Sequence, residues 1–194
     1  IVHSERIPDD IREQKVPVHG LQMWVALPAE QEESEPLFRH YASEDMPEAQ
    51  IGGARLHVLA GSAFGVSSPV ATASPTLYVA GSTTQGAELE IAADVQERAV
   101  YVVRGDVTLD GERMEPGTLA ILAPGAAVAL KAVGETVFMI LGGAPLDGPR
   151  FVWWNFVATS REKIEAAKLA WNGRDKNVFP DIPGETEWIP LPAH

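Results

Sequence analysis

The chain has 194 residues, of which 45% are hydrophobic and 22% charged, and this balance excludes a wholly disordered protein. The net charge of −12 argues against direct binding of nucleic acid, which needs clustered Lys and Arg. The chain has no cysteine and no apolar run near the roughly 20 residues that cross a bilayer, so we expect a cytoplasmic protein without thiolate sites or membrane contact.

The first 28 residues are predicted to form strands. Alternate positions from Leu21 to Leu27 are apolar, so one face of this segment is expected to be buried, and Pro28 ends the run. Residues 29–36 are acidic and polar, which indicates a solvated linker.

Many short strands are predicted after the linker. An Asp110-Gly111 pair between two of them is typical of a type I′ hairpin. Regular short strands separated by turns favour a β-sandwich or barrel. The predicted strands are residues 55–60, 76–80, 86–92, 99–104, 106–109, 118–123, 126–132 and 136–141.

One helix interrupts the strands near the end of the chain. Thr159 and Glu162 fit a capping box, with Thr159 as the N-cap, and Asn172-Gly173 supplies a stop. The apolar spacing from Ile164 to Trp171 predicts that Trp171 lies on the buried stripe. The last twenty residues contain four prolines, so we expect an extended tail that lies over a neighbouring surface.

His3 and Glu5 are the candidate metal ligands. Alternate residues of an extended strand face the same side, roughly 6.5–7 Å apart, so an imidazole and a carboxylate there can converge on one ion. Two ligands do not complete a site, and the chain begins without Met in what reads as a motif, so we expect a fragment whose other ligands are lost or unseen. The remaining histidines are expected to have structural or surface roles, and these are His19, His40, His57 and His194.

Residues 95–123 resemble a cupin barrel, through the segment Tyr101–Asp106 and the later Pro116-Gly117 turn. In cupins, the first motif carries a His-x-His pair a few residues before a Glu. Counting back from Glu97, that pair falls near Ile91 and Ala93, which are both apolar. This cupin is therefore expected to bind no metal.

The whole chain is similar to pirin, a bicupin family. The similarity implies an all-β fold, a cupin (double-stranded β-helix or jelly-roll) barrel with remnant strands of a second cupin and one C-terminal α-helix. The expected domains are 1–36, from the N-terminal cupin with a linker; 37–146, the C-terminal cupin; and 147–194, a helix and tail packing back on the N-terminal domain. The segments that carry the resemblance are Ile1–Glu5, Gly20–Val25, Pro36–Pro47, Leu141–Leu146 and Gly148–Phe156.

The resemblance also implies a site and two competing functions. His3 and Glu5 would be the last two of four ligands, three His and one Glu, that hold Fe(II) in the intact parent, and Glu5 would also be catalytic by accepting a proton from a flavonol. The first function is that of a quercetin 2,3-dioxygenase. The alternative is a non-enzymatic, metal-dependent binding protein or transcriptional co-regulator with a protein partner. This chain alone is expected to be metal-free and to be able to self-associate.

Overall fold

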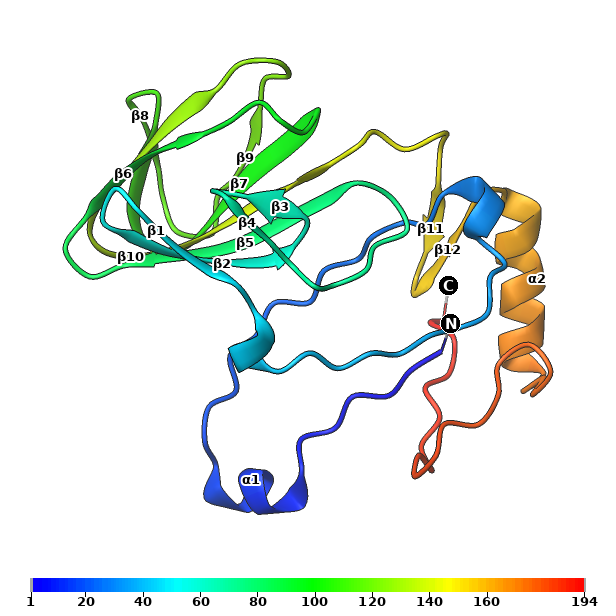
Figure 1. Cartoon of the computed structure of the whole chain (residues 1–194). Helices are drawn as coiled ribbons and strands as arrows, with labels where there is room; N and C mark the ends of the chain where they lie inside the picture. Colours follow the sequence, from blue (N-terminus) through cyan, green and yellow to red (C-terminus); the bar gives the residue numbers. More distant parts are fainter. Residues whose placement is uncertain (1, 194) are drawn as a thin grey trace. The chain divides into compact units, whose positions relative to one another are not determined.

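The computed structural model describes residues 2–193. Two residues named in the sequence analysis lie outside this range: Ile1, the first residue of the expected metal motif, and His194, one of the histidines expected to have a structural or surface role. The chain forms two compact units. Residues 37–145 make up one unit, and residues 1–36 together with 146–194 make up the other. In Figure 1 the first unit contains the strands β1 to β10, and the second contains α1, α2, β11 and β12.

The 37–145 unit is an antiparallel β-structure, as predicted. The main path of its large sheet runs β1-β2-β5-β10-β7-β8, with β6 paired to β10 and β9 paired to β7. A separate two-stranded ladder joins β3 and β4, and a short 3-10 turn spans Ser43–Asp45. The strand bounds are β1 Glu48–Ile51, β2 Ala54–Ala60, β3 Ser62–Ala63, β4 Val66–Ser67, β5 Thr76–Thr83, β6 Ala87–Ile91, β7 Glu97–Leu109, β8 Glu112–Met114, β9 Leu119–Leu122 and β10 Val128–Gly143.

Two of these strands are longer than the sequence predicts. β7 and β10 were each expected as two strands, separated near Gly105 and Gly134. Both glycines have positive φ, +82° and +70°, and the β7–β10 register shifts between Val133 and Val137. A bulge of this kind bends a strand while the ladder continues on either side, so a glycine that looked like a strand end is a bend.

The interior of the 37–145 unit is filled by apolar side chains that alternate along the strands. In β2 every second residue from Ala54 to Ala60 is buried, the period expected of a strand with one face in a core. Phe138 is completely buried on β10, and its ring lies against Gly81 on the adjacent β5. The Asp110-Gly111 turn has positive φ at both residues, as the predicted type I′ hairpin requires.

The unit of residues 1–36 and 146–194 has less regular structure. No strand forms in residues 2–28, although the sequence predicts strands there; the segment contains instead the helix α1, Asp9–Gln14, and is followed by a 3-10 turn at Ala29–Gln31. A strand needs a partner for its backbone hydrogen bonds, and no segment among residues 2–193 pairs with residues 21–28. Trp24, in the middle of this segment, is 55% exposed.

The C-terminal part of this unit combines a hairpin and a helix. The strands β11, Phe151–Trp153, and β12, Phe156–Ala158, pair antiparallel, and the helix α2 spans Arg161–Asn172 with Ile164 buried. Ser160 rather than Thr159 caps the helix, because its hydroxyl accepts a hydrogen bond from the Lys163 amide. The predicted cap was thus one residue too early.

An aromatic cluster holds the hairpin, the helix and the tail together. Trp171 lies between Phe156 and the tail, with ring centroids 6.2 Å from Phe156, 5.2 Å from Phe179 and 4.1 Å from Trp188. Trp153 and Trp154 belong to the same cluster and are half-buried. Among residues 2–193, no helix has the length and apolar character to cross a membrane.

Candidate functional site

The two predicted metal ligands lie in the segment before α1, which has no regular secondary structure. His3 and Glu5 are both exposed, and the Glu5 carboxylate accepts a hydrogen bond of 3.0 Å from the Gln22 side-chain amide. The side chains that alternate with them, those of Ser4 and Arg6, donate hydrogen bonds to Glu185. The donor types, one imidazole and one carboxylate, suit a non-haem iron site.

The number of donors does not suit a complete site. Across residues 2–193, no three or more His, Cys, Asp or Glu side chains gather closely enough to hold a metal ion. Within the described residues, His3 and Glu5 therefore have no third side chain of these types close enough to complete such a group.

Ser4 and Arg6 share one carboxylate, that of Glu185 in the C-terminal tail. The Ser4 hydroxyl and the Arg6 Nη2 both donate to it, and the Arg6 Nε donates to Oε2 at 3.0 Å. The backbone amides of Thr186 and Glu187 also donate to Oε1, each at 2.7 Å. These donors, Arg6 first, hold the pKa of Glu185 well below its usual range.

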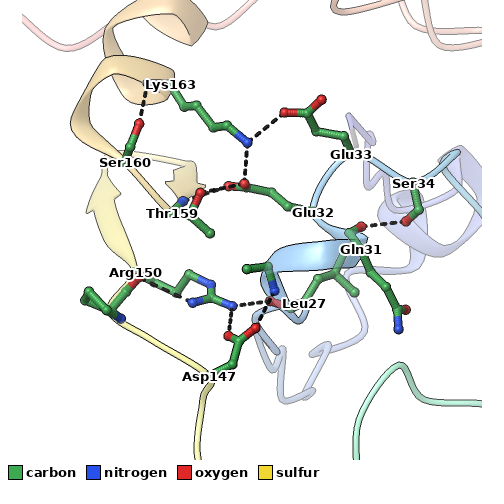
Figure 2. Close-up of polar contacts among 12 residues, drawn as sticks. Leu27, Gln31, Glu32, Glu33, Ser34, Asp147, Arg150, Thr159, Ser160 and Lys163 are labelled. Atoms are coloured by element: carbon green, nitrogen blue, oxygen red, sulfur yellow. Dashed lines mark hydrogen bonds and ion pairs between the residues drawn. The ribbon is translucent and has the colours of Figure 1, made fainter.

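A second polar contact ties the acidic segment 29–36 to the start of α2. The Glu32 carboxylate accepts hydrogen bonds from both the Thr159 amide and the Thr159 hydroxyl at 2.7 Å, and from Lys163 Nζ at 2.5 Å (Figure 2). Desolvation raises the pKa of Glu32, but the hydrogen bonds from Lys163 and Thr159 outweigh it and lower the pKa overall. The segment expected to be a solvated linker is therefore bound to the helix at this residue.

A third polar contact involves Leu27 and Ala29, which come between Arg6 and Glu32 in the sequence. Arg150 Nη2 donates to the Leu27 carbonyl at 2.7 Å and to Asp147 at 2.5 Å, and the Ala29 amide donates to Asp147 at 2.7 Å (Figure 2). The Ala29 amide and then Arg150 lower the pKa of Asp147. Glu185, Glu32 and Asp147 were not singled out by the sequence analysis; the turn signature Pro183-Gly184 beside Glu185 is the signal that could have marked one of them.

The other histidines within the described residues have surface positions. His19 and His40 are exposed, and His57 is half-buried on β2 with its Nε2 3.6 Å from Glu48. In the 37–145 unit, Ile91 stands where a cupin histidine would begin the first motif, and it is only 2% exposed within the apolar core. That barrel interior offers no polar donor at this position.

A buried arginine has a structural role in the same unit. Arg98 is 2% exposed, and its two terminal nitrogens donate to four backbone carbonyls. The acceptors lie at the end of β6, in the residue after it, and in the turn between β9 and β10, so Arg98 joins these two regions. The accepting carbonyls are those of Ile91, Ala92, Ala123 and Ala126.

Comparisons with known proteins agree with this architecture. Residues 78–177 match the family model of the pirin C-terminal cupin domain, which confirms the predicted cupin fold. A pirin-like protein of Caulobacter vibrioides is 41% identical over 194 residues, which cover 99% of this chain and 66% of that protein.

Two solved structures of quercetin 2,3-dioxygenase from Acinetobacter baumannii have the same fold. One has a TM-score of 0.79 at 24% identity and covers 88% of this chain and 57% of its own. The other has a TM-score of 0.71 at 27% identity and covers 77% and 54%. The chain thus spans between about half and two thirds of the length of these relatives.

Proposed function

This chain belongs to the pirin family, and from that premise we propose that the whole protein binds Fe(II) through His3 and Glu5 and oxygenates a flavonol of the quercetin type. By the whole protein we mean a longer chain that also carries an upstream His-x-His segment, which the family resemblance implies as the source of the first two ligands. The likeness to a quercetin 2,3-dioxygenase at 27% identity is the observation that favours this substrate class.

The chain's own residues supply part of the iron environment. His3 and Glu5 would fill two of the four ligand positions, and the Gln22 amide, 3.0 Å from the Glu5 carboxylate, would orient that ligand as outer hydrogen-bond partners commonly do. When bound, the metal supplies Lewis-acid activation of a coordinated hydroxyl. Glu5 is the group that would accept the flavonol hydroxyl proton.

The 37–145 barrel would act as a scaffold in this proposal. Its core is filled by apolar side chains, including Ile91 and Phe138, and no three metal-ligating side chains gather among its residues. The chemistry is therefore assigned to the N-terminal segment and the domain to which it contributes.

Iron content and O₂ uptake with quercetin, measured on the whole protein, test the proposal. We expect the His3→Ala variant to lose both, because one ligand is removed. His40→Ala is the matched control, since His40 is exposed and belongs to the other unit. Full iron and full uptake in the His3→Ala variant would contradict the assignment.

A second candidate function is binding of a protein partner in an iron-dependent manner, without turnover. The net charge of −12 favours this candidate, because an acidic surface attracts a basic partner. If His3→Ala loses the iron and the wild-type protein shows no O₂ uptake with quercetin, the binding function is favoured over catalysis.

A further inference from the structure

We propose that Glu185 is a positioning residue for the metal-ligand segment: through Ser4 and Arg6 it fixes the backbone that carries His3 and Glu5. This inference rests on the proposed function, because it assigns a role toward the iron ligands. It concerns a residue of the C-terminal tail that lies 180 positions from Glu5 in sequence.

The contact selects one side of the ligand segment. Ser4 and Arg6 are two residues apart and reach the same carboxylate, as alternate residues of an extended backbone do. His3 and Glu5 alternate with them, so an extended backbone directs their side chains away from Glu185. The tail therefore holds the segment through Ser4 and Arg6, while the Glu5 carboxylate accepts its hydrogen bond from Gln22.

The tail presents Glu185 in a defined turn. The Glu185 amide donates to the Ile182 carbonyl at 3.0 Å, with Pro183 and Gly184 between them and Gly184 at φ +79°. Pro followed by a glycine of positive φ is the type II pattern, so this short sequence builds its own turn. The carboxylate is then fixed by the two following backbone amides.

The aromatic cluster anchors the tail on both sides of this turn. Phe179 precedes it and stacks with Phe156 at 5.8 Å between ring centroids. Trp188 follows it and stacks with Trp171, whose Nε1 also donates to the Ile189 carbonyl at 2.9 Å. Glu185 thus belongs to a segment tied at two points, and its side chain is only 18% exposed. A carboxylate fixed in this way is an acceptor that holds the Ser4 hydroxyl and the Arg6 guanidinium in place.

The first experiment tests the contact without metal, on the 194-residue chain. Trypsin cleaves after Arg6 only when the Arg6 side chain leaves Glu185, so we expect Glu185→Ala to speed cleavage there about tenfold. Glu185→Gln keeps the side-chain volume and is expected to act in the same direction. Glu165→Ala, an exposed glutamate paired with Lys168 on α2, is the matched control and is expected to leave the rate unchanged. Unchanged cleavage at Arg6 in both Glu185 variants would overturn the contact.

The second experiment tests positioning, on the whole protein titrated with Co(II), whose visible absorption reports coordination. Removal of a group that hydrogen-bonds directly to a metal ligand typically weakens affinity 10–100-fold. Glu185 acts one residue further away, through Ser4 and Arg6, so we expect a loss at the lower end of that range, about tenfold, and an altered spectrum in Glu185→Ala. Ser4→Ala should change both in the same direction. Glu187→Ala is the matched control. The Glu187 carboxylate also lies near Arg6, at 3.4 Å from Nη2, but its side chain is 77% exposed, so its removal is expected to leave the affinity and the spectrum unchanged.

The two hypotheses fail differently in this titration. If wild-type protein binds Co(II) and Glu185→Ala binds it equally well with the same spectrum, the positioning role is overturned and the proposed function stands. If the wild-type whole protein binds no metal, both are overturned.

Discussion

The two units of this protein are stabilised in different ways. The 37–145 unit is held by a continuous apolar core within a sheet, and few of its polar side chains are buried. The other unit has a small core around Phe156 and Ile164, and its N-terminal segment is attached to its C-terminal part through the side chains of Glu32, Asp147 and Glu185. A barrel closed on itself needs no distant segment, whereas an extended segment without a partner strand depends on individual polar contacts.

The sequence provides separate optical probes for this comparison. All five tryptophans lie in the unit of residues 1–36 and 146–194, and all three tyrosines lie in the 37–145 unit. Tryptophan emission therefore follows the unit of residues 1–36 and 146–194, and tyrosine signals follow the 37–145 unit. We expect denaturation measured with the two probes to give separate transitions, with the tryptophan transition at lower denaturant.

The largest effect is expected in the barrel core. Phe138→Ala should lower the free energy of unfolding of the 37–145 unit by about 3–5 kcal/mol, because it removes a fully buried ring and leaves a cavity. Phe38→Ala, in the same unit but 85% exposed, should change it by less than about 0.5 kcal/mol. Equal effects of the two substitutions on the tyrosine-reported transition would contradict this account of the core.

A smaller effect is expected where Phe138 meets Gly81. An added Cβ at Gly81 would lie 2.3 Å from two ring atoms, so Gly81→Ala should cost roughly 1–3 kcal/mol by overpacking. In a Phe138→Leu background the added cost should fall, and a double-mutant cycle measures this coupling. Gly20→Ala, where a Cβ meets nothing within 4 Å, is the matched control in the other unit. An additive cycle would show that the ring does not limit the space at Gly81.

The smallest effect concerns pH and the Glu32 contact. The folded-state pKa of Glu32 is lowered, so its stabilisation is present above the unfolded pKa and is lost as pH falls through the folded pKa. The pKa of Lys163 is raised, so it stays charged throughout this acid range. Glu32→Gln should therefore destabilise the tryptophan-reported unit by about 1 kcal/mol at neutral pH.

The difference between wild type and Glu32→Gln should close as the pH falls below the ordinary glutamate value of 4.5. Glu33→Gln is the matched control, since Glu33 pairs with the same lysine but is 80% exposed. A difference that stays constant from neutral to acid pH would show that ionised Glu32 is not what stabilises the contact.

The barrel could be predicted from the sequence because its signals are local. Alternating apolar residues and the Asp110-Gly111 turn each indicate strands from a few neighbouring positions. The errors fall where tertiary contacts decide: Gly105 looked like a strand end but is a bend beside Thr136, and Thr159 looked like a cap but binds Glu32. Neither partner can be found from local sequence.

The ligands of the candidate site are not tested by the structure. His3 and Glu5 were selected by their spacing and by the family resemblance, and their role as ligands stays a prediction. The partners of the segment were missed because Ser4 and Glu185 are 181 positions apart, and no periodicity links residues at that distance. The strand expected at residues 21–27 failed for a related reason, since a strand depends on a partner that local sequence does not name.

The most direct test of the central claim is X-ray absorption at the iron edge, on the whole protein and its His3→Ala variant. The account predicts iron with three imidazoles and one carboxylate in the wild type, and in the variant either lost iron or one imidazole fewer. A variant that keeps full iron with an unchanged imidazole count would contradict the assignment of His3 as a ligand.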